Sequence, residues 1–584
     1  MNTNEKLQAL REQLIEHKLD GYVQPLSDEF MSEYPPACYR RVEWLTGFSG
    51  SAGTAVVLAD KAAFFTDGRY TLQAKAEVDS SLFEQHNSAD VSSAEWVSDQ
   101  LSEGRIGYDP KLFTRDMFSR MQKSLGAVEL VAVDNLVDAI WKDRPQAPAT
   151  DVFVHDEQYN GESSSSKRAR IAEAIKKTGA ECAVIAAPDS VCWLLNIRAR
   201  DVESTPLLLA PLIIDETGQV QLFVDAARVN AKMAAHLGNE VSLVDPDALA
   251  DSLSALANNK KRVLCDPSSV PLWYIRQLDG ALIVDGNDPC TLPKATKNAA
   301  EIQSTRNAHR RDGVAVTKLL HWLETQSQPV TEMDVEKQLQ SFREQVDGFV
   351  ESSFNTIAGS GPNGAIVHYR ASEKTNRTLG TGELFLLDSG GQYPDGTTDI
   401  TRTVAVGVPS AEHKEHFTRV LKGHIAVATA IFPKGTAGSQ LDTLARQYLW
   451  EAGLDYDHGT GHGVGLFLGV HEGPQRISKR GGDVALAEGM VLSNEPGYYK
   501  TGAYGIRIEN LVVVRTSDMA GDRSMLCFDT ITCAPIDTRL VDVDMLTEKE
   551  KTWLNAYHGW VLETLLSSMS SEEGEWLKAR CAAI

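Results

Sequence analysis

The chain has 584 residues, of which 42% are hydrophobic and 23% are charged, and this composition is typical of a globular protein. Its net charge of −23 argues against a nucleic-acid partner, which would require basic surfaces that displace counterions. No apolar stretch approaches the roughly 20 residues that span a bilayer, so no membrane association is expected. The length exceeds what one hydrophobic core supports and predicts three or four domains.

The N-terminal segment, residues 1–20, predicts an amphipathic helix of mixed charge and lacks the apolar core of a signal peptide. The eight cysteines are scattered, without a C-x-x-C pair or a regular spacing, and this pattern predicts reduced thiols. Together these features predict a cytoplasmic protein.

A weak internal repeat occupies the first half of the chain. "KLDGYVQP" (18–25) and "GAECAVIAAP" (179–188) each follow a helical pattern and predict a short buried strand. Each is followed by a Trp-Leu pair, at Trp44 and Trp193, which we interpret as core residues. Low-complexity segments near 143–151 and 286–297 mark boundaries. Two successive α/β domains of similar plan are therefore predicted, over 1–150 and 151–292.

The pattern changes from about residue 298, where a long helix is predicted, followed by strands rich in Gly, His, Asp and Glu. We assign a third domain to 293–540 and a helical extension to 541–584. In the extension, "TEKE" (547–550) is a capping box. Five apolar or aromatic residues then fall on one helical face: Trp553, Leu554, Tyr557, Trp560 and Val561. That face requires a partner, either the body of the protein or a second subunit.

Within the third domain, "LLDSGGQYPDGTTDIT" (386–401) places two acidic residues on either side of a turn. If Pro394 and Asp395 are the central residues of that turn, Asp388 pairs across the hairpin with Thr401. Asp399 then points to the same face, as a diagonal neighbour of Asp388. Two carboxylates held this close raise one pKa unless a cation lies between them. Asp388 ends the apolar run "LFLL", which a solubilising role explains poorly.

Further polar groups could complete a site. "HGTGHGVG" (458–465) carries His458 and His462 in a glycine-rich loop, without the lysine of a phosphate-binding loop. Glu495 is expected at a strand end. Glu509 is expected in the middle of a strand, with Arg507 on the same face. His368 lies in "IVHYR" and His471 in "VHEGP", which is not a zincin motif because position 475 is glutamine. Any one histidine could be an ordinary satisfied polar residue.

The order Asp388, Asp399, His462, Glu495, Glu509 resembles the ligand set of the pita-bread metallopeptidases, in which these residue types hold two divalent metals. Longer segments extend the resemblance to the long, cytosolic, three-domain type of aminopeptidase P, a family of Xaa-Pro aminopeptidases. They are "EYPPACYRRVEWLTGFSGSAGTAVV", "LLDSGGQYPDGTTDITRT", "HGTGHGVGLFLGVHEGP", "NEPGYYKTGAYGIRIEN" and "WLNAYHGWV".

The resemblance implies an α/β (α+β) fold, with two creatinase-like N-terminal α/β domains followed by a pita-bread catalytic domain. It also implies that Asp388 holds one metal, that His462 and Glu495 hold the other, and that Asp399 and Glu509 bridge them. Such an oxygen-rich set favours Mn²⁺, with Co²⁺ and Zn²⁺ as alternatives. His368, His458 and His471 would contact the substrate, and Arg507 would orient the carboxylates.

The implied activity is release of the N-terminal residue from peptides with proline second, by attack of a metal-bridging hydroxide on the Xaa-Pro amide. A homodimer is usual for the resembled family. Two alternatives remain open: prolidase, which shares every ligand and accepts only Xaa-Pro dipeptides, and a non-catalytic pita-bread protein that binds peptides or histones. Intact ligands argue against the second.

Overall fold

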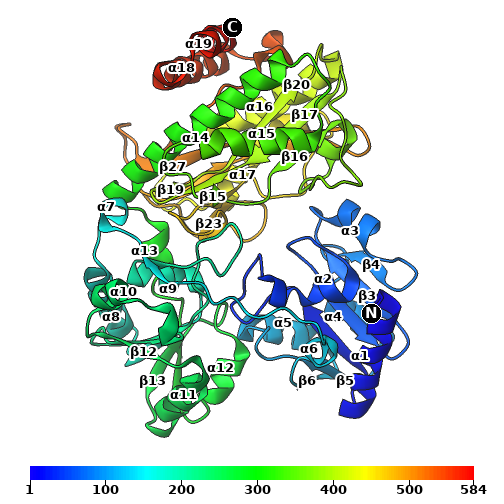
Figure 1. Cartoon of the computed structure of the whole chain (residues 1–584), viewed down its shortest axis with the longest axis vertical. Helices are drawn as coiled ribbons and strands as arrows, with labels where there is room; N and C mark the ends of the chain where they lie inside the picture. The colour runs from blue at the N-terminus through cyan, green and yellow to red at the C-terminus, as the bar shows by residue number, and fades with distance from the viewer. The chain divides into compact units, whose positions relative to one another are not determined.

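A computed structural model describes residues 1–584, and its contacts divide the chain into two compact units. The first unit contains Met1–His155 and Glu162–Thr291, and the second contains Asp156–Gly161 and Leu292–Ile584. The ribbon of the whole chain is drawn in Figure 1. The domain boundaries expected at 150, 292 and 540 stay predictions.

The first unit contains two lobes, each built on a six-stranded sheet. The elements of the first lobe are α1 (Thr3–His17), β1 (Gly21–Pro25), α2 (Arg41–Thr46), β2 (Thr54–Leu58), β3 (Ala62–Thr66), α3 (Thr71–Glu77), β4 (Glu84–Asn87), α4 (Ser93–Gln100), β5 (Gly104–Tyr108), α5 (Arg115–Leu125), β6 (Val128–Ala132) and α6 (Leu136–Ile140). Those of the second lobe are β7 (Phe153–Val154), α8 (Ser164–Lys177), β8 (Cys182–Ile185), α9 (Pro188–Leu195), β9 (Ile197–Arg198), β10 (Leu212–Asp215), β11 (Val220–Phe223), α10 (Ala231–Leu237), β12 (Val241–Val244), α11 (Leu249–Asn258), β13 (Arg262–Cys265), α12 (Leu272–Gln277) and β14 (Leu282–Asp285).

The two sheets have the same strand order. The first runs β4-β3-β2-β1-β5-β6 and the second β12-β11-β10-β8-β13-β14. Each central strand, β1 or β8, pairs antiparallel with one neighbour and parallel with the other. The internal repeat predicted from "KLDGYVQP" and "GAECAVIAAP" is therefore confirmed, since these segments supply the two central strands.

Local sequence explains how the first lobe begins. Asn2 and Glu5 form a capping box at the start of α1, which satisfies two main-chain N–H groups that the helix leaves unpaired. Leu7, Leu10 and Leu14 face the core, and the amphipathic helix predicted for residues 1–20 is confirmed.

The lobes of the first unit join through the loops that follow β5 and β13. The Leu272 N–H donates to the Phe113 carbonyl at 2.7 Å, and the Trp273 N–H donates to the Pro110 carbonyl at 2.9 Å. Asp116 donates its N–H to the carbonyl of Pro267 at 3.0 Å. These main-chain bonds make the two lobes one compact unit.

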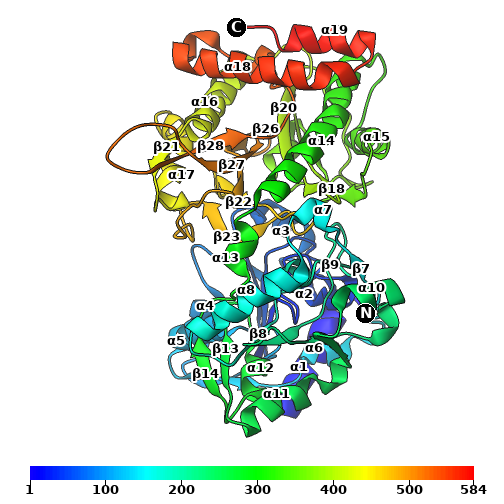
Figure 2. The ribbon, with the colours of Figure 1, turned by 90° about the vertical axis from the view of Figure 1, so that its left-hand side faces the viewer.

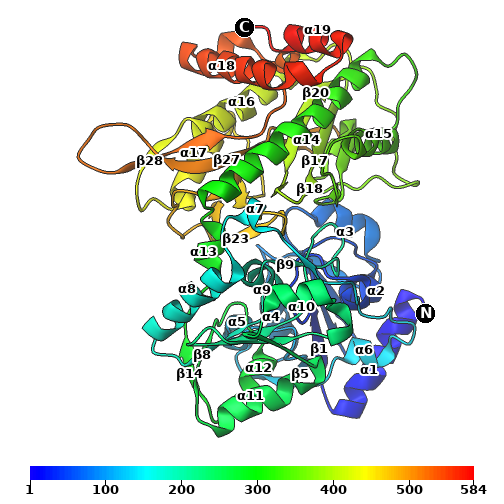
Figure 3. The same cartoon turned by 60° about the vertical axis from the view of Figure 1, so that its left-hand side comes forward.

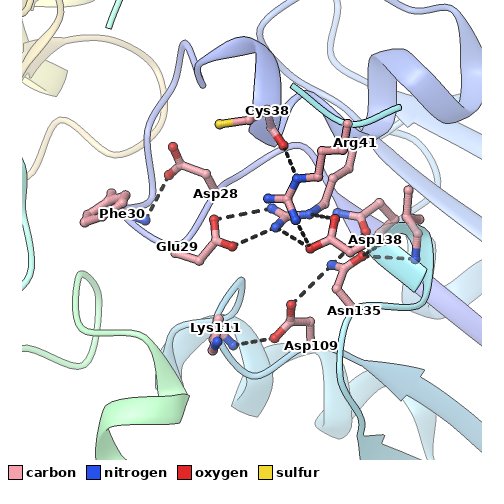
Figure 4. Close-up of polar contacts among 12 residues, drawn as sticks. Asp28, Glu29, Phe30, Cys38, Arg41, Asp109, Lys111, Asn135 and Asp138 are labelled. Atoms are coloured by element: carbon pink, nitrogen blue, oxygen red, sulfur yellow. Dashed lines mark hydrogen bonds and ion pairs between the residues drawn. The ribbon is translucent and has the colours of Figure 1, made fainter. Parts of the chain in front are cut away.

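A buried ionic network stabilises the first lobe (Figure 4). The Arg41 guanidinium, only 1% exposed, donates to the carboxylates of Glu29 and Asp138. Arg144 donates to the Cys38 carbonyl at 2.6 Å and to Asp138 at 2.5 Å. Because each charge has an opposite partner, the desolvation of the buried guanidinium is offset. The network ties the segment 29–41 to α6.

The second unit contains antiparallel sheets covered by helices. Its elements are α7 (Glu157–Asn160), α13 (Thr291–Ala295), α14 (Ala299–Thr325), α15 (Glu332–Glu344), β15 (Glu351–Ser352), β16 (Ile357–Ser360), β17 (Leu384–Ser389), β18 (Gly391–Tyr393), β19 (Gly396–Thr397), β20 (Ile400–Ala405), α16 (Ala411–Ala428), β21 (Ile431–Pro433), α17 (Gly438–Trp450), β22 (Gly461–Gly463), β23 (Glu472–Ile477), β24 (Val491–Asn494), β25 (Gly497–Lys500), β26 (Tyr504–Arg507), β27 (Asn510–Thr516), β28 (Met525–Thr530), α18 (Glu548–Leu565) and α19 (Ser571–Arg580).

The strands form two three-stranded sheets, β15-β18-β19 and β16-β17-β20, a six-stranded sheet, β21-β28-β27-β24-β22-β23, and the hairpin β25-β26. The loop between β27 and β28 projects from the unit (Figure 3). The long helix predicted from residue 298 is confirmed as α14, which begins at the cap Asn298. No helix of the chain combines the length and the apolar character that a membrane span requires. All eight cysteines are buried and none is disulfide-bonded, as predicted.

The C-terminal extension packs on the body of the second unit. Figure 2 shows α18 lying across one end of α14 and of α16. The predicted capping box at Thr547 and Glu550 starts the helix. Leu554, Tyr557 and Val561 are buried in a core shared with α16 and β26. The apolar face therefore has a partner within the same chain.

His558 of α18 should make the stability of the second unit fall at mildly acidic pH. Its Nε2 accepts the Ile536 N–H at 3.1 Å, and burial, followed by the charge of Arg402, lowers the pKa of His558 to about 4. Between pH 6.5 and pH 4, His558 binds a proton in the unfolded chain but not in the folded chain. The free energy of unfolding therefore decreases as the pH falls from 6.5 to 4. The expected loss from this one group is about 2 kcal/mol at pH 5.

Urea unfolding of the wild-type chain and of His558→Gln, measured between pH 7.5 and pH 5, checks this expectation. Glutamine keeps an acceptor but binds no proton, so the variant should have the shallower pH dependence. Equal slopes for the two proteins would contradict the assignment.

Candidate metal centre

The five residues predicted as metal ligands lie in or directly next to strands of two different sheets. Asp388 lies in β17 and Asp399 directly precedes β20, whereas His462 lies in β22, Glu495 directly follows β24 and Glu509 directly precedes β27. Four of the five lie in or next to strands with several hydrophobic residues, where burial of a carboxylate needs compensation.

The predicted hairpin register is confirmed. Asp388 pairs with Thr401, and the same register continues along β17 and β20. The Thr401 hydroxyl donates to Glu509 Oε2 at 2.9 Å, which links this hairpin to the start of β27. This register therefore places the hairpin with the two aspartates next to Glu509, just before a strand of the second sheet.

Two local expectations are wrong. Glu509 does not lie in the middle of a strand: it occupies a two-residue break between β26 and β27, because β26 pairs with β25 while β27 pairs with β24. His462 is not in a loop. It is the central residue of the short strand β22, whose flanking glycines Gly461 and Gly463 allow neighbouring main chain to approach closely.

Three of the five residues have ligand atoms within 4.8 Å of one another: Asp399, His462 and Glu509. Burial raises the pKa of Asp399 well above its ordinary value, and the charges of Asp388 and Glu495 raise it further. Burial, together with the charges of Asp399 and Asp388, likewise raises the pKa of Glu509. The metal-free cluster is therefore electrostatically strained.

His462 presents one nitrogen to the cluster. Its Nδ1 lies 2.9 Å from the Gly463 carbonyl, which can only accept, so the proton is on Nδ1 in the neutral ring. Its Nε2 lies 3.4 Å from Asp399 Oδ2 and 3.4 Å from Glu495 Oε1. A histidine fixed in this tautomer offers the lone pair of Nε2 to a metal.

The residues present fit bound cations. Asp388 Oδ1 and Glu509 Oε1 are buried and have no hydrogen-bond partner, although such atoms are costly to leave unsatisfied. The cluster holds four carboxylates, and Arg507 donates to one of them, Asp388 Oδ2, at 2.6 Å. Divalent cations bound by these oxygens would satisfy the two orphaned atoms and compensate the excess negative charge.

Of the four other predicted residues, Arg507 and His471 contact this cluster directly, and His458 is linked to it through Tyr499 and Arg507. His368 follows Val367, whose carbonyl accepts a hydrogen bond from Arg507 at 3.4 Å. The His471 ring lies edge-on to that of His462, with centroids 4.3 Å apart. His458 Nε2 lies 2.8 Å from the Tyr499 hydroxyl, which also accepts a hydrogen bond from Arg507. His368 lies in a turn just after the 3₁₀ helix 361–365. Arg507 also donates from Nε to the Thr401 hydroxyl at 3.1 Å.

The residue that organises the His368 loop was missed from the sequence. Glu332, fully buried at the start of α15, accepts hydrogen bonds from the main-chain N–H groups of Ser360 at 2.7 Å and Arg377 at 2.9 Å. It also accepts from the Tyr369 hydroxyl at 2.9 Å and from the Asn363 amide at 3.0 Å. A glutamate in the first turn of a helix is ordinarily explained by its favourable interaction with the helix dipole, so this role could not be predicted from the sequence.

A second missed group lies beside His471. Glu472 is buried, with its carboxylate 3.1 Å from Lys294 Nζ and 2.5 Å from Lys297 Nζ. Since this segment of β23 begins directly after His471, the ion pairs fix the main chain that carries the histidine.

Family profiles match almost the whole chain. Residues 303–516 match metallopeptidase family M24, and residues 524–584 match the C-terminal region of peptidase_M24. Residues 6–140 and 143–301 each match the creatinase/prolidase N-terminal domain.

Relatives of known name are similar over the full length. The chain is 41% identical to Aminopeptidase P2 of Arabidopsis thaliana, across 99% of this chain and 88% of that protein. It is 39% identical to the probable Xaa-Pro aminopeptidase P of Laccaria bicolor, across 100% and 94%.

Solved structures agree with these matches. X-prolyl aminopeptidase from Caenorhabditis elegans, described as a cytosolic enzyme with a di-nuclear active site, superposes with a TM-score of 0.96 at 35% identity and covers 100% of both chains. The prolidase of Pyrococcus horikoshii superposes with a TM-score of 0.51 at 25% identity and covers 63% of this chain. The predicted fold class, two creatinase-like α/β domains before a pita-bread domain, is confirmed, and the chain belongs to the aminopeptidase P group of metallopeptidase family M24.

Proposed function

We propose that this chain is a metal-dependent aminopeptidase that releases the first residue from peptides whose second residue is proline. The observation that carries the proposal is the cluster of four carboxylates and one fixed imidazole, with two buried oxygens that have no partner. The full-length relatives named Xaa-Pro aminopeptidase P support the choice of substrate.

Two divalent cations would be held by Asp388 on one side, by His462 and Glu495 on the other, and by Asp399 and Glu509 between them. An oxygen-rich set of this kind favours Mn²⁺, with Co²⁺ and Zn²⁺ as alternatives. Bound there, the cations would activate water and polarise the carbonyl of the first residue.

The surrounding side chains would orient and stabilise the reacting groups. His368 and His471 are assigned to hydrogen bonds that stabilise the negative charge developing on the carbonyl oxygen. Arg507 holds the Asp388 carboxylate in one orientation through its 2.6 Å hydrogen bond. His458 is placed on the substrate side, where its contact with Tyr499 orients its ring.

Proline in the second position sets the specificity. Proline has no amide hydrogen and its ring fixes φ, so the Xaa-Pro bond is a tertiary amide that general aminopeptidases handle poorly. A site shaped for the rigid ring loses less conformational entropy on binding. We assign His368 to the surroundings of that ring.

Location and assembly follow from the same proposal. We place the protein in the cytoplasm, in line with the relative described as cytosolic, and we expect a homodimer that binds neither nucleic acid nor membranes. Light scattering after size exclusion tests the dimer.

Arg-Pro-Pro, Arg-Ala-Pro and N-acetyl-Arg-Pro-Pro together test the activity. The first should release free arginine, the second far more slowly, and the third not at all, because its blocked amine can no longer meet a cation. Released arginine is measured by chromatography of the quenched reaction.

The same assay separates the alternatives. If the dipeptide Arg-Pro is hydrolysed and Arg-Pro-Pro is not, prolidase is the correct assignment. If the metal-loaded protein binds Arg-Pro-Pro without cleaving it, the chain is a peptide-binding member of the superfamily. Equal rates for Arg-Pro-Pro and Arg-Ala-Pro would refute the requirement for proline.

A further inference from the structure

Arg402 links the main chain of Glu509 to that of Thr401, the residue whose hydroxyl donates to the Glu509 carboxylate. It lies in β20, three residues after Asp399, and is 2% exposed. Its Nη1 donates to the carbonyl of Glu509 at 2.6 Å and to that of Thr401 at 2.9 Å. Its Nη2 donates to Asn510 Oδ1 at 2.8 Å. One guanidinium therefore connects β20, which follows Asp399, to Glu509 and Asn510 at the start of β27.

All the hydrogen-bond acceptors around this guanidinium are neutral. Besides those named, they are the carbonyls of Ala534 at 2.8 Å and Pro535 at 3.0 Å and the Tyr557 hydroxyl at 2.9 Å. Burial lowers the pKa of Arg402 below its ordinary value. A buried cation without a carboxylate partner depends on a complete set of acceptors, since each unsatisfied N–H carries a desolvation cost.

One of those acceptors comes from the C-terminal extension. Tyr557 lies on α18. Its hydroxyl lies 2.8 Å from the Ala534 carbonyl and 3.0 Å from the Thr532 carbonyl, and it can donate its one hydrogen to either of them. Its ring is stacked on Trp553, with centroids 5.4 Å apart and parallel planes. The hydroxyl is therefore held between Arg402 and the segment that follows β28.

Packing alone does not explain this hydroxyl. A phenylalanine would fill the same apolar space between α18 and the core, whereas the tyrosine oxygen makes its polar contacts outside its own helix. Those contacts lead to Arg402, which is bonded directly to the main chain of Glu509, and to Asn510, the next residue, at 3.3 Å. The Glu509 carboxylate is held from the other side by Thr401.

We propose that Tyr557 is a positioning residue of the metal centre: its hydroxyl fixes Arg402 and, through it, the main chain that aims Glu509 at the cations. The inference rests on the proposed function, in which Glu509 is a bridging ligand. It gives the C-terminal extension a role in metal affinity in addition to covering the core.

Tyr557→Phe tests the proposal, with the Mn²⁺ affinity of the chelated, refilled protein as the readout. Affinity is measured by competition with a chelator of known strength, and the melting temperature of the metal-free protein is recorded in parallel. Residues that support ligands typically change metal affinity by 10–100-fold, and we expect a loss of about 10-fold here. Tyr448→Phe, which removes the hydroxyl of a half-buried tyrosine in α17, is the matched control and should keep wild-type affinity.

Arg402→Lys provides a second test, because lysine keeps the charge but loses the guanidinium fork that meets Tyr557. In this background the Tyr557 change should have no further effect on affinity. Independent, multiplicative losses in the double variant would overturn the proposal.

Unchanged Mn²⁺ affinity in Tyr557→Phe, with a lowered melting temperature, would also overturn it and leave α18 as a structural cover. Failure of the proposed function has a different signature. In that case the wild-type chain itself would bind no Mn²⁺ at this site, and the inference would fall with the function.

Discussion

Replacing Asp399 with asparagine is expected to abolish peptide hydrolysis and, in the chelated protein, to raise the melting temperature. Both effects have one cause. Burial and the neighbouring carboxylates raise the pKa of Asp399, so its charged form is unfavourable in the folded, metal-free chain. Asparagine removes that charge at almost the same volume and also removes a bridging ligand. The variant should therefore have a higher melting temperature than the wild type when both are free of metal, and a lower activity when both are supplied with metal.

The measurement combines elemental analysis, thermal unfolding with and without chelator, and the Arg-Pro-Pro assay at pH 7.5. The wild-type chain should carry up to two divalent ions, lose activity on chelation and recover it best with Mn²⁺. Asp399→Asn and Glu509→Gln should melt a few degrees higher than the wild type after chelation and gain little from added Mn²⁺. Glu412→Gln, which breaks a surface contact with Lys500 and Tyr504, should change neither metal content nor activity. Full activity in a preparation shown to contain no metal would refute the mechanism.

His471→Ala and His368→Ala are expected to keep both metals and to lose rate. Neither residue is among the five assigned ligands, and each is assigned a hydrogen bond to the developing oxyanion. Removal of such a donor costs about 10²–10³-fold in kcat. His462→Ala should instead lose metal affinity, since its Nε2 faces Asp399 and Glu495.

Metal content and kcat, measured on the same preparations, separate the two classes of histidine. His413→Ala serves as the control, because His413 lies in the first turn of α16 and packs on Tyr504. If His471→Ala lost its metals as His462→Ala does, the roles assigned to the two rings would be wrong.

Local rules predicted the hairpin that carries the two aspartates. Tyr393–Gly396 is a strong turn signal, and once its central residues are chosen, the alternation of a strand fixes the partner of every residue as far as Asp388. The break before Glu509 was not predictable in this way. It arises because two consecutive strands pair with different partners, β25 and β24, and that choice is made by tertiary packing.

The supporting residues were harder to find than the ligands. Three of them, Glu332, Glu472 and Tyr557, act through contacts with segments distant in sequence. In its local sequence, each is of a residue type that is common at such a position, so none stands out as functional. Arg402 did leave a signal: an arginine in the apolar run "DITRTVAV" must be either exposed or fully satisfied. The sequence could not reveal which partners satisfy it, because they come from the break before β27, from β27 itself, from the segment after β28 and from α18.

The two lobes of the first unit have the same strand order and are joined by a linker within one chain, so their association is intramolecular. Their interface combines the main-chain hydrogen bonds described above with the apolar packing of Leu272 against the first lobe, a hydrogen bond from Arg276 to the Tyr108 hydroxyl at 2.9 Å and an ion pair between Arg115 and Asp285. Residues 145–150, which join the lobes, have no regular structure and are mostly exposed. A short tether gives each lobe an effective concentration of the other on the order of millimolar, so even a weak interface remains closed at any dilution. Because the linker makes this association intramolecular, the closed state of the unit depends on the continuity of the chain as well as on the contacts between the lobes.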